Sequence, residues 1–374
     1  MKKENKSNGW MAGTSANTTA KSMQWERYHN PNGGHGFAAE DTNMLINRIF
    51  GRKVQLLGND NAKNGADLLI DGKLYQVKYH HSAASSISDC FDCNGLFRYP
   101  GQKIMVPADQ YEEAISCMAK KISEGKVPGV SDPQMAKELV AKGNITYRQS
   151  QNLKRAGTKE SLAFDAISQM RTVAIVGGIS ALMSFIEQLL CGDDLKKALL
   201  TAAKQGCAIG GKALVVGVAT QQILRTDVGR NAATITTHAV RKGLSAASKT
   251  KLGVKTIEKI AQGAGGKVLN GAAARTAATK AIRGNILTST VVFAVDSIPD
   301  TYRLCTGKMS AKEYGKNRAI GAGGVAGGSL GYMAGMALGT AICPGIGTAI
   351  GGFVGSILGG IGGCKGTERV IDSF

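Results

Sequence analysis

The chain has 374 residues, a length that favours more than one domain. Lysine and arginine outnumber aspartate and glutamate by 46 to 27, and the net charge of +19 favours a polyanionic partner, either nucleic acid or an anionic lipid surface. The eight cysteines are scattered and the polar N-terminus is unlike a signal peptide. We therefore expect reduced thiols rather than the disulfide framework of a small secreted domain.

The first third of the chain predicts a polar arm followed by an α/β domain. Residues 1–33 are polar throughout, and we expect a flexible arm there. Residues 34–121 then show helix and strand patterns, with Asp71-Gly72 as a tight hairpin signal. The predicted elements are a helix over 36–50, strands over 53–57, 66–70, 73–79 and 103–106, and a helix over 109–121. This order predicts a mixed sheet flanked by helices.

The rest of the chain is predicted to be all-α. Residues 122–170 are polar and fit a small helical linker domain. Residues 171–318 form a helical region with apolar runs at 172–190 and 206–224, each near the length that crosses a bilayer. Between 225 and 283, twelve basic residues accompany two acidic ones, a bias that predicts a cytoplasmic position beside anionic headgroups or nucleic acid. A solvated, alanine-rich helix pair is the alternative.

One short stretch has the residues of a catalytic site. Asp67 lies near the start of one predicted strand, and Gln76 and Lys78 stand two residues apart on the next. Residues i and i+2 share one face of a strand, so the hairpin is expected to bring Gln76 and Lys78 beside Asp67. Glu40 on the preceding helix is expected to complete the set. Carboxylate and amide oxygens suit Mg²⁺, and a lysine beside them can position water or stabilise charge on a phosphate.

This arrangement resembles the PD-(D/E)xK nuclease superfamily, in the Mrr-like restriction-endonuclease variant that has glutamine before the lysine. The resemblance covers about a quarter of the chain. It implies that Asp67, Gln76 and Glu40 hold Mg²⁺ or Mn²⁺, with Asp41 as the fallback for Glu40, and that Lys78 is the catalytic lysine of a DNA endonuclease. Two alternatives stay open: a domain that binds DNA without cutting it, and a surface hairpin with a solvated lysine.

Basic residues near this stretch predict contacts with the DNA backbone. His80, Arg98 and Lys103 are the candidates, and Tyr99 is available to stack on a base, with an ordinary loop as the alternative for each. Cys90-Phe-Asp-Cys93 follows two histidines, which admits a zinc site but lacks the usual second ligand pair. Plain burial of the cysteines is the more ordinary expectation.

Glycine recurs at every fourth position in two C-terminal segments. The series is Gly323, Gly327, Gly331, Gly335 and Gly339, then Gly347, Gly351, Gly355, Gly359 and Gly363 after a central Pro-Gly. Residues four apart share one helix face, so each segment has a groove that lets a second helix approach to backbone contact. We predict a glycine-zipper helical hairpin over 319–363, associated with a membrane, and a tail over 364–374. A soluble hairpin packed on its own protein is the alternative.

Together these features predict a Mg²⁺-dependent DNA endonuclease at the bacterial inner membrane, with its nuclease domain in the cytoplasm. The expected partners are DNA, anionic membrane lipids and further copies of the chain, joined in a homo-oligomer through the zipper helices. By analogy, such a protein would act in phage defence or mobile-element conflict. Two hypotheses compete with this one: a membrane-perturbing effector whose N-terminal domain only senses nucleic acid, and a cytoplasmic nucleic-acid-binding protein whose hairpin makes oligomers.

Overall fold

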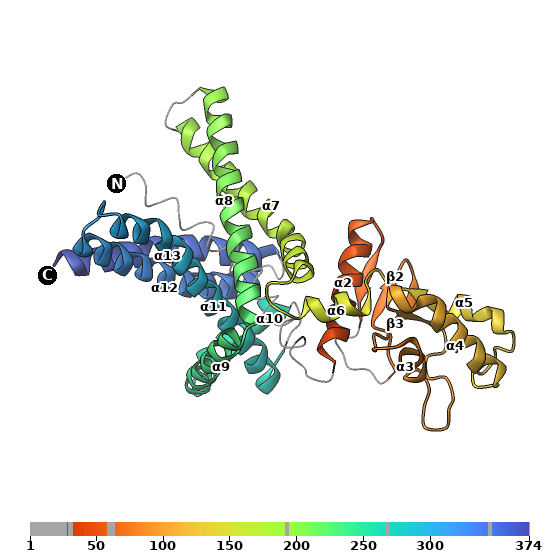
Figure 1. The fold of residues 1–374 in the computed structure, drawn as a ribbon. Helices are drawn as coiled ribbons and strands as arrows, with labels where there is room; N and C mark the ends of the chain where they lie inside the picture. The colour runs from red at the N-terminus through yellow and green to blue at the C-terminus, as the bar shows by residue number, and fades with distance from the viewer. Residues whose placement is uncertain are drawn as a thin grey trace. The chain divides into compact units, whose positions relative to one another are not determined.

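The computed structural model describes residues 28, 33–57, 64–190, 194–265, 269–342 and 346–373, and its elements are labelled in Figure 1. The chain divides into two compact units, one over 26–164 and one that includes 165–374. Most of the arm predicted over 1–33 lies outside the described residues, as does the Pro-Gly turn of the predicted hairpin.

The first unit is built on a five-stranded mixed sheet with the strand order β1-β2-β3-β4-β5. The strands are β1 (Val54–Leu56), β2 (Leu68–Ile70), β3 (Lys73–Val77), β4 (Gln102–Val106) and β5 (Val140–Lys142). The first three pair antiparallel, whereas β4 is parallel to β3 and β5 is parallel to β4. The β2–β3 hairpin turns at Asp71 and Gly72, whose φ angles of 49° and 81° are those that a type I′ turn requires.

Helices cover both faces of this sheet. They are α2 (Gly34–Ile49), α3 (Ala83–Ser88), α4 (Tyr111–Ser123), α5 (Ala136–Leu139) and α6 (Tyr147–Leu153). Successive residues of β4 alternate between two cores. Met105 packs in the core formed with α2 and α6, whereas Ile104 and Val106 pack in the core formed with α3, α4 and α5. The order of elements through α4 agrees with the mixed sheet flanked by helices that the sequence predicts.

Strand β5 departs from the helical linker domain predicted over 122–170. Val140 is buried, and it pairs with Ile104 of β4. A three-residue strand is too short to show an alternating pattern, and the short helices α5 and α6 on either side give the segment its helical character. The first unit therefore extends to residue 164 and contains most of the segment predicted as a linker.

The second unit is helical in its described residues, as predicted. Its helices are α7 (Lys159–Leu190), which begins in the first unit, α8 (Leu195–Leu224), α9 (Asp227–Ala247), α10 (Lys251–Gly265), α11 (Gly271–Cys305), α12 (Ala311–Ile342) and α13 (Ile346–Asp372). Buried residues of α9, α10, α11 and α12 share one core. The predicted tail over 364–374 is mostly helix instead, because α13 continues through Asp372.

A buried ion pair joins the first turns of α7 to the end of α8. Arg225 Nη1 and Nη2 lie 2.5 and 2.8 Å from the two carboxylate oxygens of Asp165, and both side chains are 2% exposed. Gln222 Nε2 donates a third hydrogen bond to Asp165, at 2.7 Å. Farther along, the two helices approach to backbone contact, because a Cβ added at Gly177 or Gly206 would contact the other residue's carbonyl oxygen.

Candidate functional site

The β2–β3 hairpin brings Asp67 and Gln76 together. The backbone N–H of Asp67 donates to Tyr75 O at 2.9 Å, which continues the strand pairing and places Asp67 beside the end of β3. Gln76 Nε2 donates to Asp67 Oδ2 at 2.6 Å, and the backbone N–H of Val77 donates to the same oxygen at 2.8 Å. Gln76 is 8% exposed, and its Oε1 is buried with no hydrogen-bond partner among the described residues. This oxygen is an unused acceptor next to a carboxylate.

Lys78 follows directly after β3, where its ammonium group binds Asp89. The backbone N–H of Lys78 still donates to Met105 O of β4 at 2.9 Å, so the residue is held as if the strand continued. Its Nζ lies 2.6 Å from Asp89 Oδ2 and 5.2 Å from the centre of the Tyr99 ring. Asp89 is the C-cap of α3, a six-residue helix that begins with Ser82 accepting a hydrogen bond from Ser85 N.

Two further basic side chains lie next to Asp89. His80 Nε2 lies 3.5 Å from Asp89 Oδ2, and an Arg98 guanidinium nitrogen donates to Asp89 O at 2.7 Å. Two of the three residues predicted to touch the DNA backbone are therefore near Lys78, around one acidic residue. Asp89 is not among the residues predicted for the site, because the six-residue helix α3 is too short to show a periodic pattern in the sequence.

The Lys78–Asp89 pair shifts both groups toward their charged forms. Burial, the largest single cause, acts to lower the pKa of Lys78, but the hydrogen bonds and charge interactions with Asp89 and Tyr99 together raise that pKa above its ordinary value. Burial likewise acts to raise the pKa of Asp89, yet the Lys78 ammonium lowers that pKa overall. The site thus holds a charged lysine, and a substrate phosphate that binds Lys78 would either share its ammonium group with the Asp89 carboxylate or displace that carboxylate.

The other residues predicted for this site have different surroundings. Lys103 forms an ion pair with Glu138 of α5 at 3.2 Å, away from Asp89. Glu40 is buried in α2, the helix that packs on the other face of the sheet from α3, so its metal-binding role stays a prediction. The fallback residue Asp41 is also buried in α2, where it accepts a hydrogen bond from Tyr28 at 2.7 Å. Tyr99 is 3% exposed, which corrects the expectation that it stacks on a base.

The donors at this site fit Mg²⁺ or Mn²⁺ in number and type. Mg²⁺ takes oxygen ligands, commonly one or two from the protein, and keeps several waters. Asp67 and the unused Gln76 Oε1 are two such oxygens. In the part of the chain that the structure describes, no three His, Cys, Asp or Glu side chains are grouped to hold a metal. Cys90 is buried and Cys93 is exposed, and neither belongs to such a group, so the described residues give no support to the zinc alternative.

The predicted glycine zipper forms a helical hairpin from α12 and α13, which lie side by side in Figure 1. An added Cβ at most of the zipper glycines would overlap a backbone carbonyl of the facing helix. The opposed pairs are Gly323 with Gly363, Gly327 with Gly359, Gly331 with Gly355, and Gly335 with Gly351. The packing environment of Gly347 lies outside what the structure describes. These glycine faces are used inside one chain, so the predicted homo-oligomer through them stays a prediction.

The outer face of the hairpin is apolar. Leu330 and Leu338 of α12 are 65% and 68% exposed, and Leu358 of α13 is 65% exposed. Lys196–Leu224 and Ala311–Ile342 are long and apolar enough to cross a membrane, by length and composition alone. They contain the predicted apolar run at 206–224 and the first arm of the zipper. Helices of this length and composition also occur in the cores of soluble proteins.

Comparison with known proteins finds relatives of both parts. Residues 16–123 match the family described as the YeeR C-terminal domain. The inner membrane protein YeeR of Escherichia coli (strain K12) is 46% identical over 99 residues, which is 25% of this chain and 19% of that protein. Residues 316–366 match the C13G5.2-like glycine zipper domain, whereas no solved structure matches the chain. The chain is thus similar to YeeR proteins near its N-terminus and to a glycine-zipper family over α12 and α13.

Proposed function

We propose that this chain is a membrane-associated protein whose N-terminal unit is a metal-dependent DNA endonuclease. One observation carries the nuclease part: Gln76 binds Asp67 through its Nε2, keeps a buried and unused Oε1, and lies near the end of β3 two residues before the charged Lys78. The order of elements and the mixed sheet support the resemblance to PD-(D/E)xK nucleases on which this proposal rests. A role in phage defence or mobile-element conflict rests on analogy with such nucleases.

The residues of the site divide the work of phosphodiester hydrolysis. Asp67 and Gln76 would hold Mg²⁺. When bound, this ion would lower the pKa of its water ligand and polarise a phosphoryl oxygen. Lys78 would donate to the scissile phosphate as negative charge develops on it. Asp89 keeps Lys78 charged and oriented until that phosphate arrives, and His80 and Arg98 attract the neighbouring backbone phosphates.

Membrane association has separate support. YeeR is named an inner membrane protein, two helices here have the length and composition of membrane spans, and the zipper hairpin exposes leucines on its outer face. The glycine contacts between α12 and α13 are those by which apolar helices pack without bulky side chains. The basic stretch after α8 favours a cytoplasmic position for that part of the chain.

Cleavage of plasmid DNA by the full chain, purified from membranes in detergent, tests this proposal. We expect Mg²⁺-dependent cleavage that Asp67→Asn lowers by at least about 100-fold, since one carboxylate of the site is lost. The matched control is Asp71→Asn, the same change on the exposed turn of the same hairpin, where Asp71 pairs with Arg52. Equal cleavage by the two variants would remove Asp67 from the mechanism.

A second candidate function is a membrane-perturbing effector whose N-terminal unit binds nucleic acid without cutting it. The observation that favours it is the Lys78–Asp89 ion pair, because the lysine that cleavage would require already has an acidic partner within the protein. DNA binding without cleavage by the folded wild-type chain, together with leakage of dye from vesicles that contain it, would select this second function.

A further inference from the structure

A groove with two arginine walls lies between α9 and α11. It has a volume of about 380 Å³ and is lined by Arg241, Leu244, Ser245, Ala272, Arg275, Thr276 and Thr279. Arg283 of α11 donates to Thr237 of α9 at 3.3 Å, whereas Ser245 and Arg275, later in α9 and earlier in α11, line the same groove, so the two helices run antiparallel. Because residues four apart share a helix face, this pairing aligns Arg241 with the hydroxyl-bearing side of α11.

The charge in this groove is not neutralised by the protein. Arg241 and Arg275 are exposed, one on each wall, and neither has an ion pair or side-chain hydrogen bond to the residues that the structure describes. The lining contains no acidic side chain; Glu258 lines the neighbouring hollow that shares Arg275.

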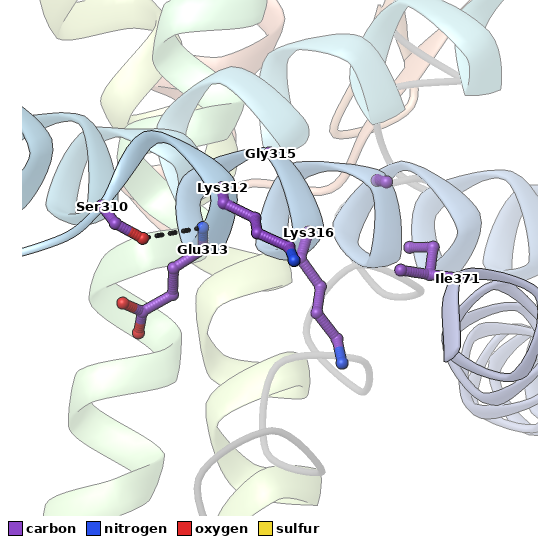
Figure 2. A pocket seen from close by; sticks show the side chains of 7 residues that line it. Ser310, Lys312, Glu313, Gly315, Lys316 and Ile371 are labelled. Carbon is purple, nitrogen blue, oxygen red and sulfur yellow. Dashed lines mark hydrogen bonds between the residues drawn. The ribbon is translucent and has the colours of Figure 1, made fainter. Parts of the chain in front are cut away.

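A second basic hollow shows the contrast. It lies where α12 begins and α13 ends, and Figure 2 shows Lys312 and Lys316 at its wall with Glu313 beside them. Lys316 Nζ binds Asp372 at 2.6 Å, and Glu313 supplies another negative charge. That hollow therefore compensates its own lysines, whereas the groove between α9 and α11 is lined by two arginines and Ser245 with no acidic side chain among its lining residues.

The groove chemistry fits a phosphate group. The planar, forked donors of arginine match phosphate oxygens and form short, charge-assisted hydrogen bonds with them. Two arginines on facing walls can bind different oxygens of one phosphate, and the Ser245 hydroxyl can donate to a third. Leu244 at the same groove leaves apolar surface beside the arginines.

The surroundings of the groove favour a lipid as the source of the phosphate. Helix α9 begins three residues after the end of α8, one of the two membrane-length helices. Its outward side exposes Val228 by 75% and Ile235 by 70%, and Leu252 at the start of α10 is 77% exposed. Exposed apolar side chains among basic ones are typical of helices that lie at a membrane interface.

We propose that the Arg241–Arg275 groove binds the phosphate of an anionic phospholipid headgroup. This inference rests on the membrane association proposed above and is independent of the nuclease. It assigns the lipid contact of the basic stretch to one site between two helices, in place of a diffuse attraction along 225–283.

The test measures binding of short-chain phosphatidylglycerol to the full chain in neutral detergent. For the double variant Arg241→Gln/Arg275→Gln we expect the affinity to fall about 30-fold, because the loss of each arginine is expected to weaken binding about fivefold. The matched control is Lys242→Gln/Lys249→Gln, which removes the same charge from two exposed positions outside the groove, one in α9 and one just after its end, and should change the affinity less than about threefold. Circular dichroism of each variant verifies that the helices remain folded.

Further arms separate the sources of phosphate. Phosphatidylcholine should bind weakly to all variants, and inorganic phosphate should compete with phosphatidylglycerol only at far higher concentration. Equal losses in the groove and control variants would overturn the proposal, as would a groove that prefers inorganic phosphate. Loss of DNA binding with lipid binding intact would assign the groove to nucleic acid instead. Membrane fractionation of the wild type is run in parallel. A wild type that is absent from the membrane fraction would contradict membrane association itself, whereas a membrane-bound wild type with no loss of lipid binding in the groove variant would contradict this site alone.

Discussion

Alanine at both Gly331 and Gly355 is expected to open the zipper hairpin. Each glycine faces the other, and an added Cβ at either would overlap the other's backbone carbonyl. A helix backbone cannot move aside as a flexible side chain can, so α12 and α13 must separate along the contact. Overpacking of this kind costs about 1–3 kcal/mol per site, which exceeds the gain of up to about 1 kcal/mol from replacing a helical glycine by alanine.

Hydrogen exchange along α12 and α13 in the detergent-solubilised chain measures this effect. The matched control replaces Gly315 of α12 and Gly362 of α13 by alanine, because an added Cβ at either would meet nothing within 4 Å. The control pair should slow exchange or leave it unchanged, since only the helix propensity rises. Faster exchange in the Gly331/Gly355 variant alone is the expected result. The same response in both double variants would mean that the two helices do not pack through these glycines.

Removing one partner of the Asp165–Arg225 pair should destabilise the contact between α7 and α8. Both side chains are 2% exposed, and two hydrogen bonds join the guanidinium to the carboxylate. Asp165→Asn leaves Arg225 as a buried charge without its counterion, a change that costs about 3–5 kcal/mol in other proteins. The expected result is a lower thermal midpoint of the helical unit, measured by circular dichroism.

Two further variants define the cause. Asp372→Asn breaks the exposed Lys316–Asp372 pair and should cost less than about 1 kcal/mol, because solvent screens that pair. The double change Asp165→Leu/Arg225→Met removes both charges and should recover part of the lost stability. If Asp165→Asn is as mild as Asp372→Asn, burial of the pair does not govern the stability of this contact.

Local patterns predicted the hairpin and the zipper well. Asp71-Gly72 specifies a tight turn by its backbone preference alone, and the turn then sets the register that brings Gln76 to Asp67. Glycine at every fourth position likewise specifies a groove wherever the segment is helical. Such features depend on residues close in sequence, so they are visible before any tertiary contact is known.

Features that depend on distant partners were not predictable in the same way. Three-residue β5 exists because its backbone pairs with β4, and its own sequence has no strand pattern. Asp89 becomes part of the site because α3 places it 2.6 Å from Lys78, and its six-residue helix has too few turns to be recognised. Lys103 was grouped with Arg98 by sequence proximity, but strand β4 directs it to Glu138.

If Asp67 and Gln76 form a metal site, Mn²⁺ binding reveals it without knowledge of the substrate. Electron paramagnetic resonance of the full chain in detergent would compare the wild type with Asp67→Asn, Gln76→Met and the control Asp71→Asn. We predict that the wild type and the control bind Mn²⁺ alike, and that the two site variants bind at least about tenfold more weakly. A wild type that binds no Mn²⁺, or site variants that bind as tightly as the control, would contradict the account.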